Sequence, residues 1–106
     1  MGEYVQVVTA VGNEEEAEKI SQMVVEKRLA GCAQVIGPIT SLYRWKGKIE
    51  KDKEWLCLIK TRTDLYQELE STIRKVHSYE NPEILAVPII NGSKRYIDWL
   101  ESELKK

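Results

Sequence analysis

The sequence contains no phenylalanine, one histidine and only two cysteines among its 106 residues. Two cysteines are too few for a disulfide framework. Both Cys32 and Cys57 lie in apolar segments, where a reduced thiol packs as a small hydrophobe. The chain has no apolar run near the roughly 20 residues that cross a bilayer, and residues 1–4 lack the basic and apolar regions of an export signal. We therefore expect a cytoplasmic protein with no membrane partner.

The charges of the chain almost cancel. Lys and Arg number 16 and Asp and Glu number 17, for a formal net charge of -1. This balance argues against a nucleic-acid partner, and the RNP pattern of RNA-recognition modules is missing around Trp55. The length suits a single domain over residues 1–106.

The first segment of the chain predicts a strand followed by a helix. Residues 4–11 are β-branched and almost continuously apolar, which is typical of a strand covered on both faces. Asn13 with Glu16 three residues later has the form of a helix cap with a capping-box acid. Gly31 indicates where this helix ends.

A long hairpin is expected next. Its strands cover residues 32–45 and 48–61, and Lys46 and Gly47 form the turn between them. Gly37 with Pro38 indicates a bulge in the first strand. The apolar run at residues 55–59 is the buried part of the second strand, so the rest of the hairpin should project beyond the core.

The remaining residues predict two helices around one more strand. Thr63 can cap a helix whose buried stripe ends at Val76. Residues 84–90 form an apolar strand, and Pro88 places it at a sheet edge because proline cannot donate to a ladder. Ser93 then caps a short C-terminal helix.

The element order predicts an α+β fold, the ferredoxin-like split βαββαβ sandwich with a long hairpin and a short C-terminal helix. Right-handed crossovers place both main helices on one face of the sheet. The other face is then uncovered, although the strands at 4–11 and 55–59 look apolar on both sides. We therefore expect that face to pack against further copies of the chain.

His77 is the first candidate for chemistry. It lies at the end of the second helix, and Glu80 or Glu83 could complete a mixed metal site with it. The structural alternative is a histidine that interacts with the last carbonyls of its helix. Cys32 is a further candidate ligand, in an open site or one shared between chains.

The two cysteines cannot share a metal ion within one subunit. A turn that pairs Trp45 with Lys48 sets Cys57 near Ile36 and Cys32 near Thr61. The two sulfurs then lie on the order of 13 Å apart at ~3.3 Å per residue. Packing in the core is the simpler interpretation of both.

Enzymatic readings find little support in the sequence. A nucleophilic pair of Cys32 with His77 would lack an oxyanion hole and an orienting third group. The loop after the first strand leads into three glutamates at 14–16, which would repel a phosphate. We therefore expect a protein that is not an enzyme.

Aromatic and charged side chains near strand ends suggest a pocket between subunits. Its candidate residues are Tyr43, Trp45, Lys60 and Tyr79. For Tyr43 and Trp45, packing within the hairpin is an equally good explanation.

Four ordered motifs give the chain a family resemblance. SLYRWKGKIE, EWLCLIKT, HSYENPEI and YIDW follow one another in this order, together with RLAGCAQV around Cys32. From about Tyr4 to Trp99 the sequence resembles the CutA divalent-cation-tolerance family. The resemblance implies a ferredoxin-like subunit in a homotrimer, with hairpins exchanged between neighbours, similar in plan to PII-type signalling proteins.

The resemblance also implies divalent metal ions, copper among them, as ligands, with the family's motif histidine at His77. This chain departs from the family pattern at three positions. Val8 and Val76 stand where some members have a cysteine and a second histidine, and Ser78 replaces the proline of HPYE. These changes remove soft or imidazole ligands and favour a weaker site, or one that uses Cys32 and carboxylates.

Two functions follow as expectations. The first is a cytoplasmic homotrimer that binds copper or another divalent cation near His77 and contributes to cation tolerance. The second is a PII-like trimeric signalling or scaffold protein that holds a small ligand or partner in clefts between subunits.

Overall fold

A computed structural model of the protein describes residues 3–106. Residues 1 and 2 lie outside the described residues. They belong to the segment 1–4, which lacks the features of an export signal, and to the predicted domain 1–106. The elements are β1 (Tyr4–Val11), α1 (Glu14–Glu26), β2 (Cys32–Trp45), β3 (Lys48–Arg62), a 3-10 turn (Thr63–Leu65), α2 (Tyr66–Val76), β4 (Ile84–Pro88) and α3 (Lys94–Glu103).

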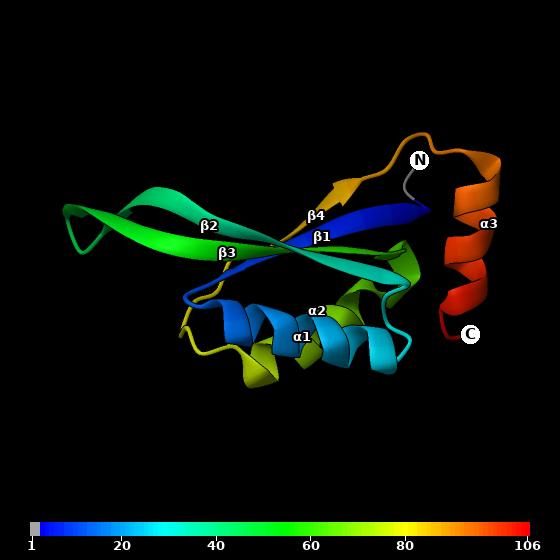
Figure 1. Ribbon diagram of the computed structural model, residues 1–106, viewed down its shortest axis with the longest axis horizontal. Coiled ribbons are helices and arrows are strands. Elements are labelled where there is room, and N and C mark those ends of the chain that lie inside the picture. Colours follow the sequence, from blue (N-terminus) through cyan, green and yellow to red (C-terminus); the bar gives the residue numbers. More distant parts are fainter. Residues whose placement is uncertain (1–2) are drawn as a thin grey trace.

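The strands form one sheet in the order β2-β3-β1-β4, with antiparallel neighbours. Figure 1 shows α1 and α2 side by side under one face, while α3 stands across one end and the β2–β3 hairpin extends beyond the other. The predicted ferredoxin-like α+β fold is confirmed, and β4 lies at a sheet edge as Pro88 requires. Within residues 3–106, no helix is long and apolar enough to cross a membrane.

The core lies between the sheet and the two helices. Alternate residues of β1 and β3, such as Val7 and Ile59, point down onto Ile20 of α1 and onto Leu69 and Ile73 of α2, and all five are at most 1% exposed. Burying an aliphatic side chain of this size stabilises a fold by roughly 1.5–3 kcal/mol. This layer therefore holds the sheet and the helices together.

Helix α1 begins as predicted and ends earlier. The Asn13 side chain accepts a hydrogen bond from the backbone N–H of Glu16 at 2.8 Å. The helix stops at Glu26, whereas Gly31 was the predicted end. Arg28 adopts a positive φ of 58°, and the N–H groups of Leu29 and Ala30 both donate to the Val24 carbonyl. This turn ends the helix without a glycine.

Helix α2 and strand β4 also differ from the expected limits. A single 3-10 turn that begins at Thr63 precedes α2, so the helix starts at Tyr66. Val76, predicted to be buried, is the last residue of α2 and is 50% exposed. Strand β4 ends at Pro88, two residues before the predicted end at Ile90.

The hairpin contains the predicted bulge, and the bulge changes its register. Residues 37 and 38 of β2 lie together opposite β3 between the pairs Ile36–Leu56 and Ile39–Glu54. Beyond it, Cys57 pairs with Val35 and Cys32 with Lys60, one residue away from the predicted partners. Cys32 and Cys57 therefore face opposite sides of the sheet, since side chains alternate along a strand.

The face opposite the helices remains open and apolar. Val8 of β1 lies between Leu58 of β3 and Leu85 of β4 in the sheet. Leu85 and Val87 are 56% and 50% exposed. We call this surface, centred on Val8, Leu58 and Leu85, the open face.

Candidate functional site

The loop at residues 77–83 begins with a buried histidine that contacts its own subunit. The side chain of His77 is fully buried. Its Nε2 lies 2.9 Å from the Ala10 carbonyl oxygen, and its Nδ1 accepts a hydrogen bond from the Tyr79 N–H at 3.1 Å. A carbonyl can only accept, so Nε2 carries the proton. Both ring nitrogens are thus engaged, and a metal could bind only by displacing one of these bonds.

Glu16 holds the same loop from α1. Its carboxylate accepts hydrogen bonds from the N–H and the hydroxyl of Ser78, both at 2.9 Å, and lies 3.8 Å from Nδ1 of His77. The predicted capping-box acid therefore binds a distant loop. A proline at position 78 could provide neither donor. The Glu16–Ser78 contact consequently distinguishes this chain from the HPYE pattern described above.

Tyr79 joins the loop to the hairpin. Its hydroxyl donates to Glu54 of β3 at 2.9 Å. Burial, followed by this hydrogen bond, raises the pKa of Tyr79. The phenol therefore stays protonated at neutral pH and keeps its role as a donor.

A groove runs between the hairpin and the loop, with a volume of about 550 Å³. Its aromatic lining residues are Tyr43, Trp45 and Tyr79, and its charged ones are Arg44, Glu54, Glu80 and Glu83. The Tyr43 hydroxyl donates to Asp52, which raises the pKa of Tyr43 to about 12. We call this feature the hairpin groove. Its volume lies in the range of small-molecule sites.

The groove brings together three of the four residues predicted to form a pocket. Tyr43, Trp45 and Tyr79 line it, but Lys60 does not. Lys60 lies beside Cys32 in the sheet, and its ammonium donates to Gln34 at 2.7 Å. Lys60 lies six positions further along β3 than Glu54, and a strand advances ~3.3 Å per residue, so the length of the strand keeps Lys60 out of the groove.

The predicted metal ligands do not converge within one subunit. Glu80 and Glu83 line the groove, whereas His77 points away from it into the core. Cys32 lies near Tyr96 of α3, at the opposite end of the sheet from the loop (Figure 1). Among residues 3–106, no group of three His, Cys, Asp or Glu side chains is arranged to hold a metal ion.

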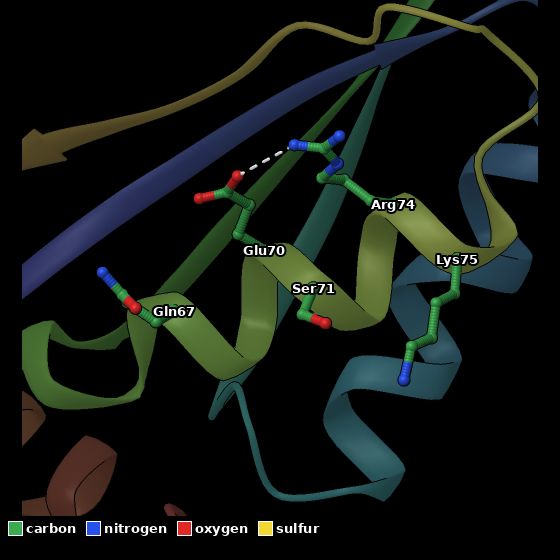
Figure 2. A pocket seen from close by; sticks show the side chains of 5 residues that line it. All are labelled: Gln67, Glu70, Ser71, Arg74 and Lys75. Carbon is green, nitrogen blue, oxygen red and sulfur yellow. Dashed lines mark ion pairs between the residues drawn. The ribbon is translucent and has the colours of Figure 1, made fainter.

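A second hollow, about 570 Å³ in volume, is shown in Figure 2. All its lining residues belong to α2: Gln67, Glu70, Ser71, Arg74 and Lys75. Arg74 and Glu70 form an ion pair with each other at 3.5 Å. This hollow is a depression on one helix without an opposing wall, and none of the predicted site residues lies in it.

Glu54 and Arg44 are the charged groove residues that sequence reasoning missed. Both lie within the motifs that carried the family resemblance. The signal for Glu54 is its position in the sequence. It directly precedes the apolar run at residues 55–59, so it lies where the hairpin begins to project beyond the core. Its contact with Tyr79 depends on how the loop folds back, which strand alternation does not reveal.

Comparison with known proteins identifies close relatives. Residues 5–103 match the family model described as CutA1 divalent ion tolerance protein. The divalent-cation tolerance protein CutA of Thermus thermophilus is 42% identical over 89% of this chain and 91% of its own length. Protein CutA of Mus musculus is 48% identical over 83% of this chain. That match covers 50% of the mouse protein, so the chain corresponds to about half of this longer relative.

Solved structures agree with the sequence comparison. The Thermus thermophilus divalent cation tolerance protein superposes with a TM-score of 0.93 at 38% identity, over 96% of this chain and 99% of that one. An Archaeoglobus fulgidus CutA, described as a periplasmic divalent cation tolerance protein, gives 0.93 at 34% identity over 96% and 99% of the two chains.

The predicted cytoplasmic location is wrong on this comparison. The Archaeoglobus protein is described as periplasmic, and an Arabidopsis thaliana relative, 36% identical over 93% of this chain, is named chloroplastic. That second match covers 54% of the plant protein. Relatives with this fold therefore occupy different compartments, and the features that suggested the cytoplasm do not specify one.

Proposed function

This chain belongs to the CutA1 divalent ion tolerance family, and from that premise we propose that it acts in tolerance by binding divalent cations directly, copper among them. The observation that carries the proposal is the match of residues 5–103 to the family model.

The proposed cation site uses Glu80 and Glu83 with donors from another subunit. Within residues 3–106, neither carboxylate makes a hydrogen bond or an ion pair, and both face the hairpin groove. Transition metals need several ligands at about 2 Å, and residues 3–106 of one subunit do not assemble such a set. Cys32 remains a candidate donor, whereas His77 would serve by holding the loop in place.

The proposed assembly is a homotrimer. The open face supports self-association, because Leu85 and Val87 are exposed beside Val8 and Leu58. When another copy covers apolar surface of this kind, the surface is removed from water, and this stabilises the assembly. The hairpin projects beyond the rest of the sheet in Figure 1, so it is free to contact a neighbouring subunit.

The proposed role is not enzymatic. The Thermus and Archaeoglobus relatives carry the names of tolerance proteins. No relative named above is described as a signalling protein, so the PII-like alternative receives no support from the comparison.

Calorimetric titration with Cu(II) and Zn(II) tests the proposal. The protein is first stripped of metal with a chelator, and its mass in solution is recorded for every variant. Glu80→Gln/Glu83→Gln is expected to weaken binding at least about tenfold, because two anionic donors are lost. His77→Gln is expected to retain binding.

A matched control removes two carboxylates elsewhere. Glu15 and Glu18 are exposed on α1 and do not line the groove, so Glu15→Gln/Glu18→Gln makes the same change in net charge outside it. Equal weakening in both double variants would contradict a dedicated site. Growth of a metal-sensitive bacterium in copper connects binding to function: the native chain should restore tolerance and the groove variant should not.

A further inference from the structure

The hairpin groove combines carboxylates with aromatic rings, and a metal ion bound to the carboxylates would leave the rings without a role. Glu54, Glu80 and Glu83 bring three carboxylates to it, against one guanidinium from Arg44. Glu54 already accepts the Tyr79 hydroxyl, whereas Glu80 and Glu83 have no polar partner among the described residues. The groove therefore attracts positive charge with two carboxylates that make no hydrogen bond or ion pair within residues 3–106.

Aromatic rings form much of the remaining wall. Tyr43, Trp45 and Tyr79 present neutral rings, since hydrogen bonds to Asp52 and Glu54 keep the two tyrosines protonated. The faces of such rings attract ammonium groups. The protein itself contains one example, because the Lys46 ammonium lies 5.8 Å from the centre of the Trp45 ring.

The same features do not suit a bare metal ion within one subunit. Ring faces supply no metal ligands, and no three carboxylate, thiol or imidazole groups converge among residues 3–106. Carboxylates that are spread along a groove with aromatic walls match a ligand whose positive charges are also spread out. The volume of about 550 Å³ accommodates such a molecule.

We propose that the hairpin groove binds an extended organic polyammonium ion, with its ammonium groups on Glu80 and Glu83 and its aliphatic chain against Tyr43, Trp45 and Tyr79. This inference goes beyond the proposed metal role and does not rest on it. The two ligands share Glu80 and Glu83, so they compete wherever both bind. Arg44 opposes the polyammonium ion and limits its affinity.

Spermidine is the probe for this proposal. Calorimetry on the full-length protein in its native oligomeric state, with chelator present to exclude metals, should give saturable binding that weakens as salt is raised. Glu80→Gln/Glu83→Gln is expected to weaken this binding about tenfold. Arg44→Gln is expected to strengthen it, because a guanidinium that lines the groove and repels the ligand is removed.

The variant Glu15→Gln/Glu18→Gln is the control, and it should bind spermidine as the native chain does. Trp45→Leu tests the aromatic wall separately and should weaken binding without a change of charge. Equal effects of the two double variants would overturn the proposal, because they would show unspecific attraction to a negative surface. Absence of saturable binding at millimolar spermidine would also overturn it.

Zinc separates this inference from the proposed function. Spermidine binding without zinc binding would support the groove and contradict the metal role. Zinc binding without spermidine binding would support the metal role and overturn the inference. Where both bind, added zinc should lower the apparent affinity for spermidine, and this competition should disappear in Glu80→Gln/Glu83→Gln.

Discussion

The imidazole of His77 bonds to the Ala10 carbonyl at the end of β1 and to the Tyr79 amide in the following loop. Removing the ring leaves a buried carbonyl without its donor and opens a cavity between α2 and the sheet. Each effect costs about 1–3 kcal/mol. His77→Ala is therefore expected to lower the free energy of unfolding by about 2–6 kcal/mol, measured by urea denaturation.

His77→Gln is the control, because its side-chain amide can still donate to Ala10. We expect it to lose clearly less stability than His77→Ala. Equal losses would exclude the Ala10 contact as the cause. A native-like stability for His77→Ala, combined with a loss of copper binding, would contradict the structural role and restore His77 as a ligand.

Local sequence pattern correctly placed His77 at the end of a helix and offered both a metal site and a structural role. It could not decide between them. The partner of Nε2 lies 67 positions earlier in the chain, and the Glu16 carboxylate that holds Ser78 lies 62 positions earlier. The direction of the ring depends on these long-range contacts, so residue spacing alone carries no information about it.

At the scale of one element, the bulge in β2 sets the register of the hairpin beyond it, from Cys32 to Ile36. A Cβ at Gly37 would overlap the indole of Trp55 on the neighbouring strand. Gly37→Ala must therefore move Trp55 or the bulge, and it is expected to cost about 1–3 kcal/mol of stability. Thermal or urea unfolding measures this loss, and near-UV circular dichroism should report the changed surroundings of the indole.

Gly47 in the hairpin turn is the comparison. No atom lies within 4 Å of an added Cβ there, and only the positive φ of 81° opposes a side chain. Gly47→Ala should cost about 1 kcal/mol and leave the near-UV signal unchanged. A larger effect at Gly47 than at Gly37 would show that the turn, and not the bulge, controls the hairpin.

The bulge also explains why the cysteines were placed incorrectly. Gly37 and Pro38 predicted it, but pairing was counted from the turn without the extra residue. A slip of one residue exchanges the two faces of a strand. Cys57 consequently lies in the core against α1, and Cys32 lies on the side of α3.

For the whole molecule, element order and apolar alternation were sufficient to predict the fold and an uncovered sheet face. Both predictions depend on the regular spacing of apolar residues, and each strand and helix shows this spacing within its own sequence. The groove required more, because its walls come from β2, β3 and the loop after α2. Tyr43, Trp45 and Tyr79 were predicted together, but their combination with Glu54 depends on how three separate segments pack.

The open face allows the last prediction, which concerns assembly. Leu85 is 56% exposed in the isolated subunit, so Leu85→Glu should change the stability of a single chain little. In a trimer that covers this face, the same change would bury a carboxylate in an apolar interface, at a cost of several kcal/mol. Light scattering should then show the mass of one chain. Val25→Glu, at a 40% exposed valine of α1, should retain the trimer. A trimer that persists in Leu85→Glu would exclude the open face as the interface.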